Sequence, residues 1–100
     1  MTRQIPGDIT TIQTFEEIEA WKRARIIAKR IFLLSTTGTF SKDYKFKDQI
    51  NGAAGSIMDN IAEGFERDGS REFIQFLAIA KGSAGEVRSQ LHRAYDRQHV

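Results

Sequence analysis

Apolar residues recur at steps of three and four along most of this chain, with polar residues between them. This is the spacing of one face of an α-helix, and no strand-like alternation competes with it. The pattern predicts three long helices, over residues 15–35, 42–65 and 70–97. Short connections join them, so we expect consecutive helices to be antiparallel neighbours. The predicted fold class is all-α: an up-and-down antiparallel helical bundle of the four-helix type, with three long helices in this chain.

Residues that favour helix ends stand at the expected boundaries. Thr14 and Glu17 have the spacing of a capping box at the start of the first helix. Gly38 is expected to cap the end of that helix, because glycine readily adopts the left-handed backbone required there. Ser41 and Ser70 are the expected N-cap residues of the second and third helices.

The first thirteen residues differ from the rest of the chain. They include Pro6 and Gly7 and show no helical period, so residues 1–13 are predicted to form an irregular arm. Residues 14–100 then form one helical bundle domain, since no repeat or linker divides them. The arm has no apolar segment of the kind found in signal peptides, and the longest apolar run, residues 31–34, is far too short to cross a bilayer. We therefore expect a cytoplasmic protein with no membrane partner.

The helix faces predict which residues are buried. The predicted core face of the first helix consists of Trp21, Ala24, Ala28, Ile31 and Phe32. A second apolar strip lies outside that face and consists of Ile26 and Leu33. It indicates a contact between subunits. The later helices have four interior glycines: Gly52, Gly55, Gly82 and Gly85. Each costs up to about 1 kcal/mol relative to alanine, so we expect close backbone approach where these two helices cross.

A polar stripe borders the apolar face of the second and third helices. Its members are Gln49, Ser56, Asn60, Glu63, Ser83 and Glu86. Polar groups beside a core are costly unless they form hydrogen bonds, so we expect a structural network with Asn60 and Glu63 near its centre. Three interpretations are open: boundary residues that fix the helix register, a ligand or catalytic site, or a contact between subunits.

The residue types needed for catalysis or metal binding are scarce. The chain has no Cys and two His residues, both near the end of the third helix. Neither lies at the level of Ser56 and Ser83, so a hydrolase triad would lack its base. No Glu-x-x-His pair is present for a carboxylate di-iron site, and no glycine-rich loop follows a strand. We expect no enzymatic activity, no catalytic residue, no metal site and no cofactor.

Charge is unevenly distributed, although the net charge is only +2. From Trp21 to Lys42 inclusive there are six basic residues and no acidic residue. Three of them recur at steps of three and four, so they share one stripe of the first helix, and such a stripe can contact phosphate groups. The candidate nucleic-acid-binding residues are these three and two from the third helix: Lys22, Arg25, Lys29, Arg88 and Arg93.

Four stretches carry a resemblance to a known family: FEEIEAWKRA, FSKDYKFKDQI, AAGSIMDNIAEGFER and FIQFLAIAKGSAGEVRSQL. They cover most of residues 14–95 with their spacing intact, and NIAEGF followed by AKGS is highly specific. The chain resembles the small bacterial four-helix-bundle proteins encoded in 23S rRNA intervening sequences. Their relatives include the accessory variability determinants of diversity-generating retroelements.

The resemblance implies a bundle that assembles into a homo-oligomeric ring, with a pentamer favoured, and that has no established catalytic activity. The retroelement relatives bind a reverse transcriptase and nucleic acid through a basic ring surface. The partners implied for this chain are therefore RNA or DNA, a reverse transcriptase or another protein, and further copies of itself.

Two departures from the family pattern affect these expectations. The family often has a basic pair after the Gln-Ile of the second helix, where this chain has Asn51 and Gly52. Two phosphate contacts are thereby lost. The family also has a fourth helix after a short turn, which is expected to be truncated at residues 98–100 or replaced by another subunit.

Three functions are therefore open. The first is a non-enzymatic, oligomeric accessory protein that binds the RNA or DNA backbone through a basic face. The second is a protein-interaction scaffold whose charges only keep it soluble. The third is a small-molecule or catalytic site around Asn60, Glu63 and Ser83.

Overall fold

The computed structural model describes residues 3–4 and 11–100. Its elements are β1 (Arg3–Gln4), β2 (Thr11–Ile12), the 3-10 helix η1 (Phe15–Glu17), α1 (Glu19–Ser35), the 3-10 helix η2 (Gly38–Lys42), α2 (Tyr44–Glu66) and α3 (Ser70–Asp96). The predicted all-α class and the three long helices are confirmed. The two strands pair antiparallel and lie in the segment predicted to be irregular, because two residues per strand are too few to leave an alternation in the sequence. Residues 1–2 and 5–10 of the predicted arm lie outside the described residues.

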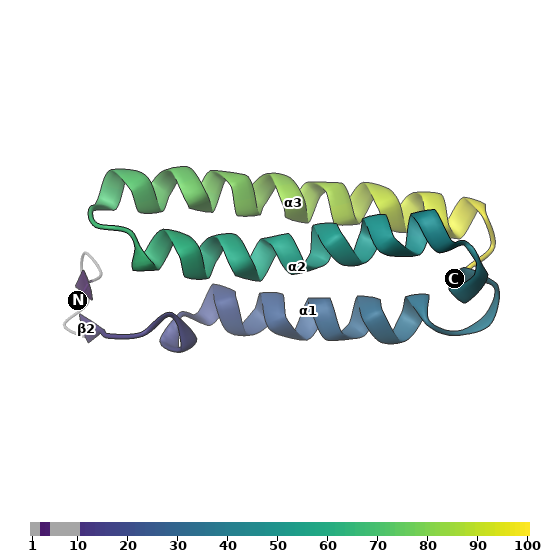
Figure 1. Ribbon diagram of the computed structural model, residues 1–100, viewed down its shortest axis with the longest axis horizontal. Coiled ribbons are helices and arrows are strands. Elements are labelled where there is room, and N and C mark those ends of the chain that lie inside the picture. Colours follow the sequence, from purple (N-terminus) through teal and green to yellow (C-terminus); the bar gives the residue numbers. More distant parts are fainter. Residues whose placement is uncertain (1–2, 5–10) are drawn as a thin grey trace.

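α2 is the central helix of the bundle. Figure 1 shows the three helices side by side and antiparallel, with α2 between α1 and α3. α2 packs along both neighbours, whereas α1 and α3 hardly contact each other. Eight residues of α2 are buried, compared with three of α1 and four of α3. The bundle is therefore elongated, with dimensions of 47 × 19 × 19 Å, and its outer helices are each covered on one side.

The core follows the apolar face of α2. Its buried members are Ala24, Ile31, Phe40, Phe46, Ile50, Ala53, Ala54, Ile57, Ile61, Ala80, Val87 and Ala94. On α2 the order Ile50, Ala54, Ile57, Ile61 has the 4-3-4 spacing of helices that pack at a small crossing angle. The alanines that α1 and α3 contribute leave room for both helices to approach this face.

The predicted core face of the first helix is wrong at Phe32. Ala24 and Ile31 are buried and Trp21 and Ala28 are half-buried, but the Phe32 side chain is 57 % exposed. At about 100° per residue, Phe32 lies about 80° from Ala24 around the helix. That side of α1 is not covered, because α1 packs against one neighbouring helix and not two.

The close approach between α2 and α3 occurs at Gly64. A Cβ atom on Gly64 would lie 2.6 Å from Cβ of Phe76 and 3.1 Å from Cδ1 of Phe73. Four other glycines are predicted to allow the crossing: Gly52, Gly55, Gly82 and Gly85. A Cβ atom added at any of these four would meet no neighbouring atom within 4 Å. The explanation offered for those four residues is therefore wrong, since they face away from the crossing.

Helix ends differ from the predicted caps by one or two residues. Ser41 lies inside η2, where its Oγ donates to the Gly38 carbonyl oxygen at 2.6 Å, and the N-cap residue of α2 is Asp43. Gly38 has the left-handed backbone expected of a cap, with φ of +58°, but it opens η2. Ser70 is the first residue of α3, and Gly69 is its N-cap.

The predicted capping box is present, but it starts η1. Glu17 Oε2 accepts hydrogen bonds from the backbone N–H groups of Gln13, at 2.7 Å, and of Thr14, at 2.8 Å. These bonds hold the pKa of the Glu17 carboxyl below its ordinary value, because they stabilise the ionised form. The bond from Thr14 has the larger effect. The backbone then leaves the helical region at Ile18, so α1 begins at Glu19.

Gly64→Ala is expected to destabilise the bundle, although alanine is the better helix former. The new methyl group must displace Phe76, and overpacking of this kind costs about 1–3 kcal/mol, which outweighs a propensity gain of up to about 1 kcal/mol. Gly52→Ala, on the same helix, is the matched control and is expected to stabilise by up to about 1 kcal/mol. Urea unfolding followed by circular dichroism measures both. Similar effects of the two substitutions would contradict the close approach at Gly64.

Candidate nucleic-acid interface

The three candidate phosphate-binding residues of α1 share one exposed stripe. Lys22, Arg25 and Lys29 are all exposed and lie within about 60° of one another around the helix. The guanidinium carbon of Arg25 lies 5.8 Å from the centroid of the Trp21 ring. This contact supports the Arg25 side chain while leaving its N–H groups on the surface.

Little negative charge on α1 opposes this stripe. The one acidic residue of α1, Glu19, accepts a hydrogen bond from Arg23 Nε at 3.3 Å. Within the described chain, no ion pair involves the three stripe residues. Their donors are therefore available to an anion such as a phosphate group.

The other two candidate residues lie apart from the stripe. α3 flanks α2 on the side away from α1, so Arg88 and Arg93 are separated from α1 by the central helix. They also point in directions about 140° apart around α3. Arg88 lines a hollow with Leu91 and Tyr95, whereas the guanidinium carbon of Arg93 lies 4.5 Å from the centroid of the Phe46 ring. The five candidate residues do not form one continuous face of a single chain.

A small polar network joins α2 to α3. The Oγ atoms of Ser56 and Ser83 are 2.9 Å apart, within hydrogen-bonding distance. Asn60 Nδ2 donates both to the Ser56 carbonyl oxygen and to Ser56 Oγ, each at 2.8 Å. Three of the six residues predicted for the network are thus brought together, and the hydrogen bond between the two serines fixes the register of the two helices.

The other three predicted members lie outside this network. Glu63 accepts from Arg67 Nη2 at 3.0 Å on the exposed surface, so the expectation that it lies near the centre is wrong. Its long side chain reaches a partner one turn further along α2. Glu86 accepts from Gln90 Nε2 at 3.3 Å, and Gln49 is exposed. Gln90 is 4 % exposed, and its Oε1 atom has no hydrogen-bond partner in the described chain.

A cluster at the end of α3 was not predicted from the sequence. Asp43 Oδ2 accepts hydrogen bonds from Arg97 Nη1 at 2.8 Å and from His99 Nε2 at 2.9 Å. His99 Nδ1 lies 2.9 Å from Thr39 Oγ1, and the His99 ring stacks on Phe40 with 4.8 Å between centroids. We call these five residues the C-terminal clasp, because they fasten the residues after α3 to the connection between α1 and α2.

The clasp keeps the Asp43 carboxyl ionised. The hydrogen bonds from His99 and then from Arg97 hold the pKa of Asp43 below its ordinary value. A sequence signal for this arrangement existed, because the start of α2 and the end of an antiparallel α3 must lie at the same end of the bundle. An acidic residue before α2 and basic residues at the end of α3 are therefore brought to the same end of the bundle, but the sequence does not determine which of them pair.

A second missed contact ties α1 to α2. Asn51 Nδ2 donates to Ser35 Oγ and to the Lys47 carbonyl oxygen, both at 2.8 Å. Ser35 is fully buried. Asn51 thus forms a part-buried hydrogen bond between two helices.

Neither a metal centre nor a membrane span is found in the part of the chain that the structure describes. Residues 3–4 and 11–100 contain no group of three or more His, Cys, Asp or Glu side chains placed to hold a metal ion. Within the same ranges, no helix combines the length and the apolar character needed to cross a bilayer.

A comparison with known protein families gives a match over most of the chain. The profile described as 23S rRNA-intervening sequence protein matches residues 16–100. The chain belongs to this family. No curated protein matches it. Family membership agrees with the resemblance carried by the helix motifs, and the match begins at η1 and spans all three long helices.

Asp43→Asn is expected to weaken the C-terminal clasp at neutral pH. Because the folded carboxyl has the lower pKa, its ionised form stabilises the fold above the unfolded pKa of about 3.9, and this contribution is lost as the pH falls through the folded pKa. Thermal unfolding should therefore show a lower midpoint for the variant at about pH 7. The difference should shrink as the pH falls below the unfolded pKa and through the lower pKa of the folded carboxyl. Asp59→Asn, at an exposed position of α2, is the matched control. A pH-independent difference would contradict this role of Asp43.

Proposed function

We propose that this chain is a non-enzymatic, oligomeric accessory protein that binds the phosphate backbone of RNA or DNA. The observation that carries the proposal is the exposed stripe of Lys22, Arg25 and Lys29, which form no ion pair within the described chain. Contacts from such residues go to phosphate groups and carry no base information, so binding is tolerant of sequence and sensitive to salt.

Repetition of the stripe in an oligomer makes the proposed binding effective. Three phosphate contacts from one chain give a weak interaction, but several copies on one nucleic acid act at a high effective concentration. The same helix also carries apolar residues suited to assembly, since Ile26, Phe32 and Leu33 are 52 %, 57 % and 55 % exposed. Exposed apolar residues gathered on one helix are typical of protein contacts.

The hydrogen bonds of the polar network support a non-enzymatic role. Ser56, Asn60 and Ser83 bond to one another, and the imidazole of His99 is held in the C-terminal clasp at the end of the bundle. A serine nucleophile needs a base within hydrogen-bonding reach, and these serines bond to an amide and to each other.

A protein-interaction scaffold is the second candidate function. The observation that favours it is the same set of exposed apolar side chains on α1. In that case the basic stripe only borders a protein contact and keeps the surface solvated.

The triple variant Lys22→Gln, Arg25→Gln, Lys29→Gln is expected to lose RNA and DNA binding together while keeping its oligomeric state. Each lost phosphate contact makes the negative slope of log K against log salt shallower by about 0.9. Loss of three contacts should therefore make the slope shallower by about three per chain. Electrophoretic shift assays at about 50 and 200 mM salt measure this. The fluorescence of Trp21, the one tryptophan, reports on the same surface because Arg25 lies over its ring.

The matched control removes the same charge elsewhere on exposed positions, as Lys42→Gln, Lys45→Gln, Arg71→Gln. It is expected to retain most of the binding. Equal losses in the two variants would indicate a general charge effect and contradict the stripe. Absence of any shift with the unaltered protein would favour the scaffold.

The variant Ile26→Gln, Leu33→Gln is expected to lower the oligomeric state. Both side chains are about half exposed in the single chain, so the change removes apolar surface from a subunit contact without opening a cavity in the core. Sedimentation measures assembly, and circular dichroism checks that the helices persist. A stable monomer formed by the unaltered protein at micromolar concentration would overturn the oligomer.

A further inference from the structure

The exposed ring of Phe32 lies on the same side of α1 as the basic stripe. The side chain is 57 % exposed. At about 100° per residue, Phe32 lies about 20° from Arg25 and about 60° from Lys29 around the helix. At about 1.5 Å per residue, it lies about 10 Å from Arg25 and about 5 Å from Lys29 along the helix axis. The ring therefore borders two cations that form no ion pair within the described chain.

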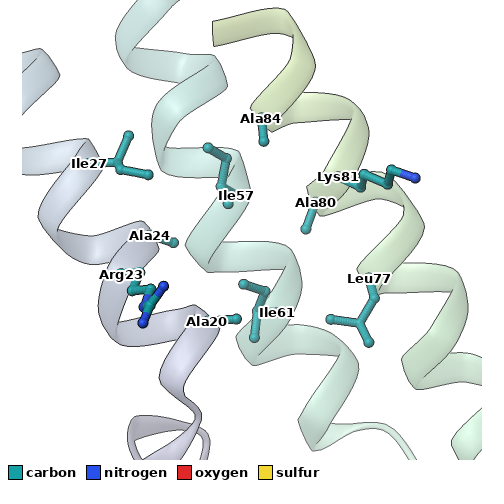
Figure 2. Close-up of a pocket in the computed structure, with 10 residues that line it drawn as sticks. All are labelled: Ala20, Arg23, Ala24, Ile27, Ile57, Ile61, Leu77, Ala80, Lys81 and Ala84. Carbon is teal, nitrogen blue, oxygen red and sulfur yellow. The ribbon is translucent and has the colours of Figure 1, made fainter. Parts of the chain in front are cut away.

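This side of α1 faces away from the apolar groove over Ile57 and Ile61 that Figure 2 shows. The α1 residues that line the groove are Ala20, Arg23, Ala24 and Ile27. Phe32 lies about 140° from Ile27 around the helix, and the buried Ile31 lies between them. A helix seated in the groove would thus leave the Phe32 ring on the surface.

The part of α2 beside Phe32 is neutral and open. Asn51 Nδ2 donates to Ser35 Oγ, and the two helices are antiparallel, so Phe32 is level with about residue 54 or 55 of α2. Gly55 lies one turn beyond Asn51 at this level, and a Cβ atom added to it would meet no neighbouring atom within 4 Å. Among residues 3–4 and 11–100, no aromatic ring or cation stacks on the Phe32 ring. One face of the ring is therefore accessible to a flat partner.

An exposed aromatic ring beside unpaired cations is the combination that binds single-stranded nucleic acid. The cations contact phosphate groups, and the ring stacks on a base. Every base has a π-face, so stacking on Phe32 needs no particular sequence. In a duplex the bases are already stacked on one another and their faces are covered. The ring thus favours unpaired strands, whereas the phosphate contacts alone do not separate a strand from a duplex.

We propose that Phe32 stacks on an unpaired base of single-stranded RNA or DNA whose phosphate groups bind Arg25 and Lys29. The inference rests on the proposed function, and it names the class of nucleic acid that this surface prefers. Lys22 lies about two turns before Lys29 on the same stripe and extends the path of phosphate contacts along α1.

One RNA strand of mixed sequence, about 12 nucleotides long, tests the preference. The labelled strand is titrated with the full chain, both alone and annealed to its complement, and binding is followed by fluorescence anisotropy at about 50 mM salt. The single strand is expected to bind more tightly, although the duplex carries about twice the phosphate charge. Equal affinities, or tighter binding of the duplex, would overturn the stacking.

Substitution of the ring assigns the preference to Phe32. Phe32→Leu keeps an apolar side chain but removes the π-face, so affinity for the single strand should fall about fivefold or more. Affinity for the duplex and the salt slope should stay unchanged, because no phosphate contact is removed. Phe32→Trp should keep the single-strand affinity. Tyr95→Leu removes another exposed ring, on α3, and is the matched control, expected to leave both affinities unaltered.

The outcomes separate this inference from the proposed function. Salt-dependent binding that Phe32→Leu leaves unchanged would overturn the stacking and leave the phosphate-binding stripe in place. Sedimentation identifies a different role, since a lower oligomeric state of Phe32→Leu, with equal losses for strand and duplex, would assign Phe32 to a subunit contact and overturn the stacking. Absence of binding to either RNA by the unaltered protein would overturn the proposed function and the stacking together.

Discussion

The structure is built on one helix that has to bury two sides at once. The apolar face of α2 packs against α1 and α3 together, through the 4-3-4 series Ile50, Ala54, Ile57 and Ile61. Each side also has a side-chain hydrogen bond between helices. Asn51 bonds to Ser35 of α1, and Ser56 bonds to Ser83 of α3. Because both outer helices depend on the same face, a change on α2 affects the two of them together.

The exposed surfaces of the protein follow from this arrangement. Because α1 and α3 are each covered on one side, apolar side chains such as Phe32 and Ile26 lie in solvent in the single chain. The same geometry leaves a groove above Ile57 and Ile61. A three-helix layer of this size has more apolar surface than it can bury alone. The proposed binding to copies of itself or to another protein would cover that surface.

The two ends of the bundle are held by different interactions. At one end the C-terminal clasp joins Asp43 to Arg97 and His99, with aromatic stacking on Phe40. Toward the other end, apolar contacts and the close approach at Gly64 hold α2 against α3. Acidification is expected to act on the first kind of contact, since Asp43 titrates, and not on the second.

The sequence by itself determined the helices, and only the tertiary structure decided which of their sides are covered. Helical periodicity, the Thr14 and Glu17 box and the short connections are local, so the three helices and the exposed stripe on α1 could be predicted. The exposure of Phe32 and the close approach at Gly64 could not, because periodicity marks an apolar face without saying how many neighbours cover it. Contacts such as Asp43 with His99 join residues far apart in sequence, and no local pattern records them. Packing around α2 decides these features, since a side chain is buried only where another helix reaches it.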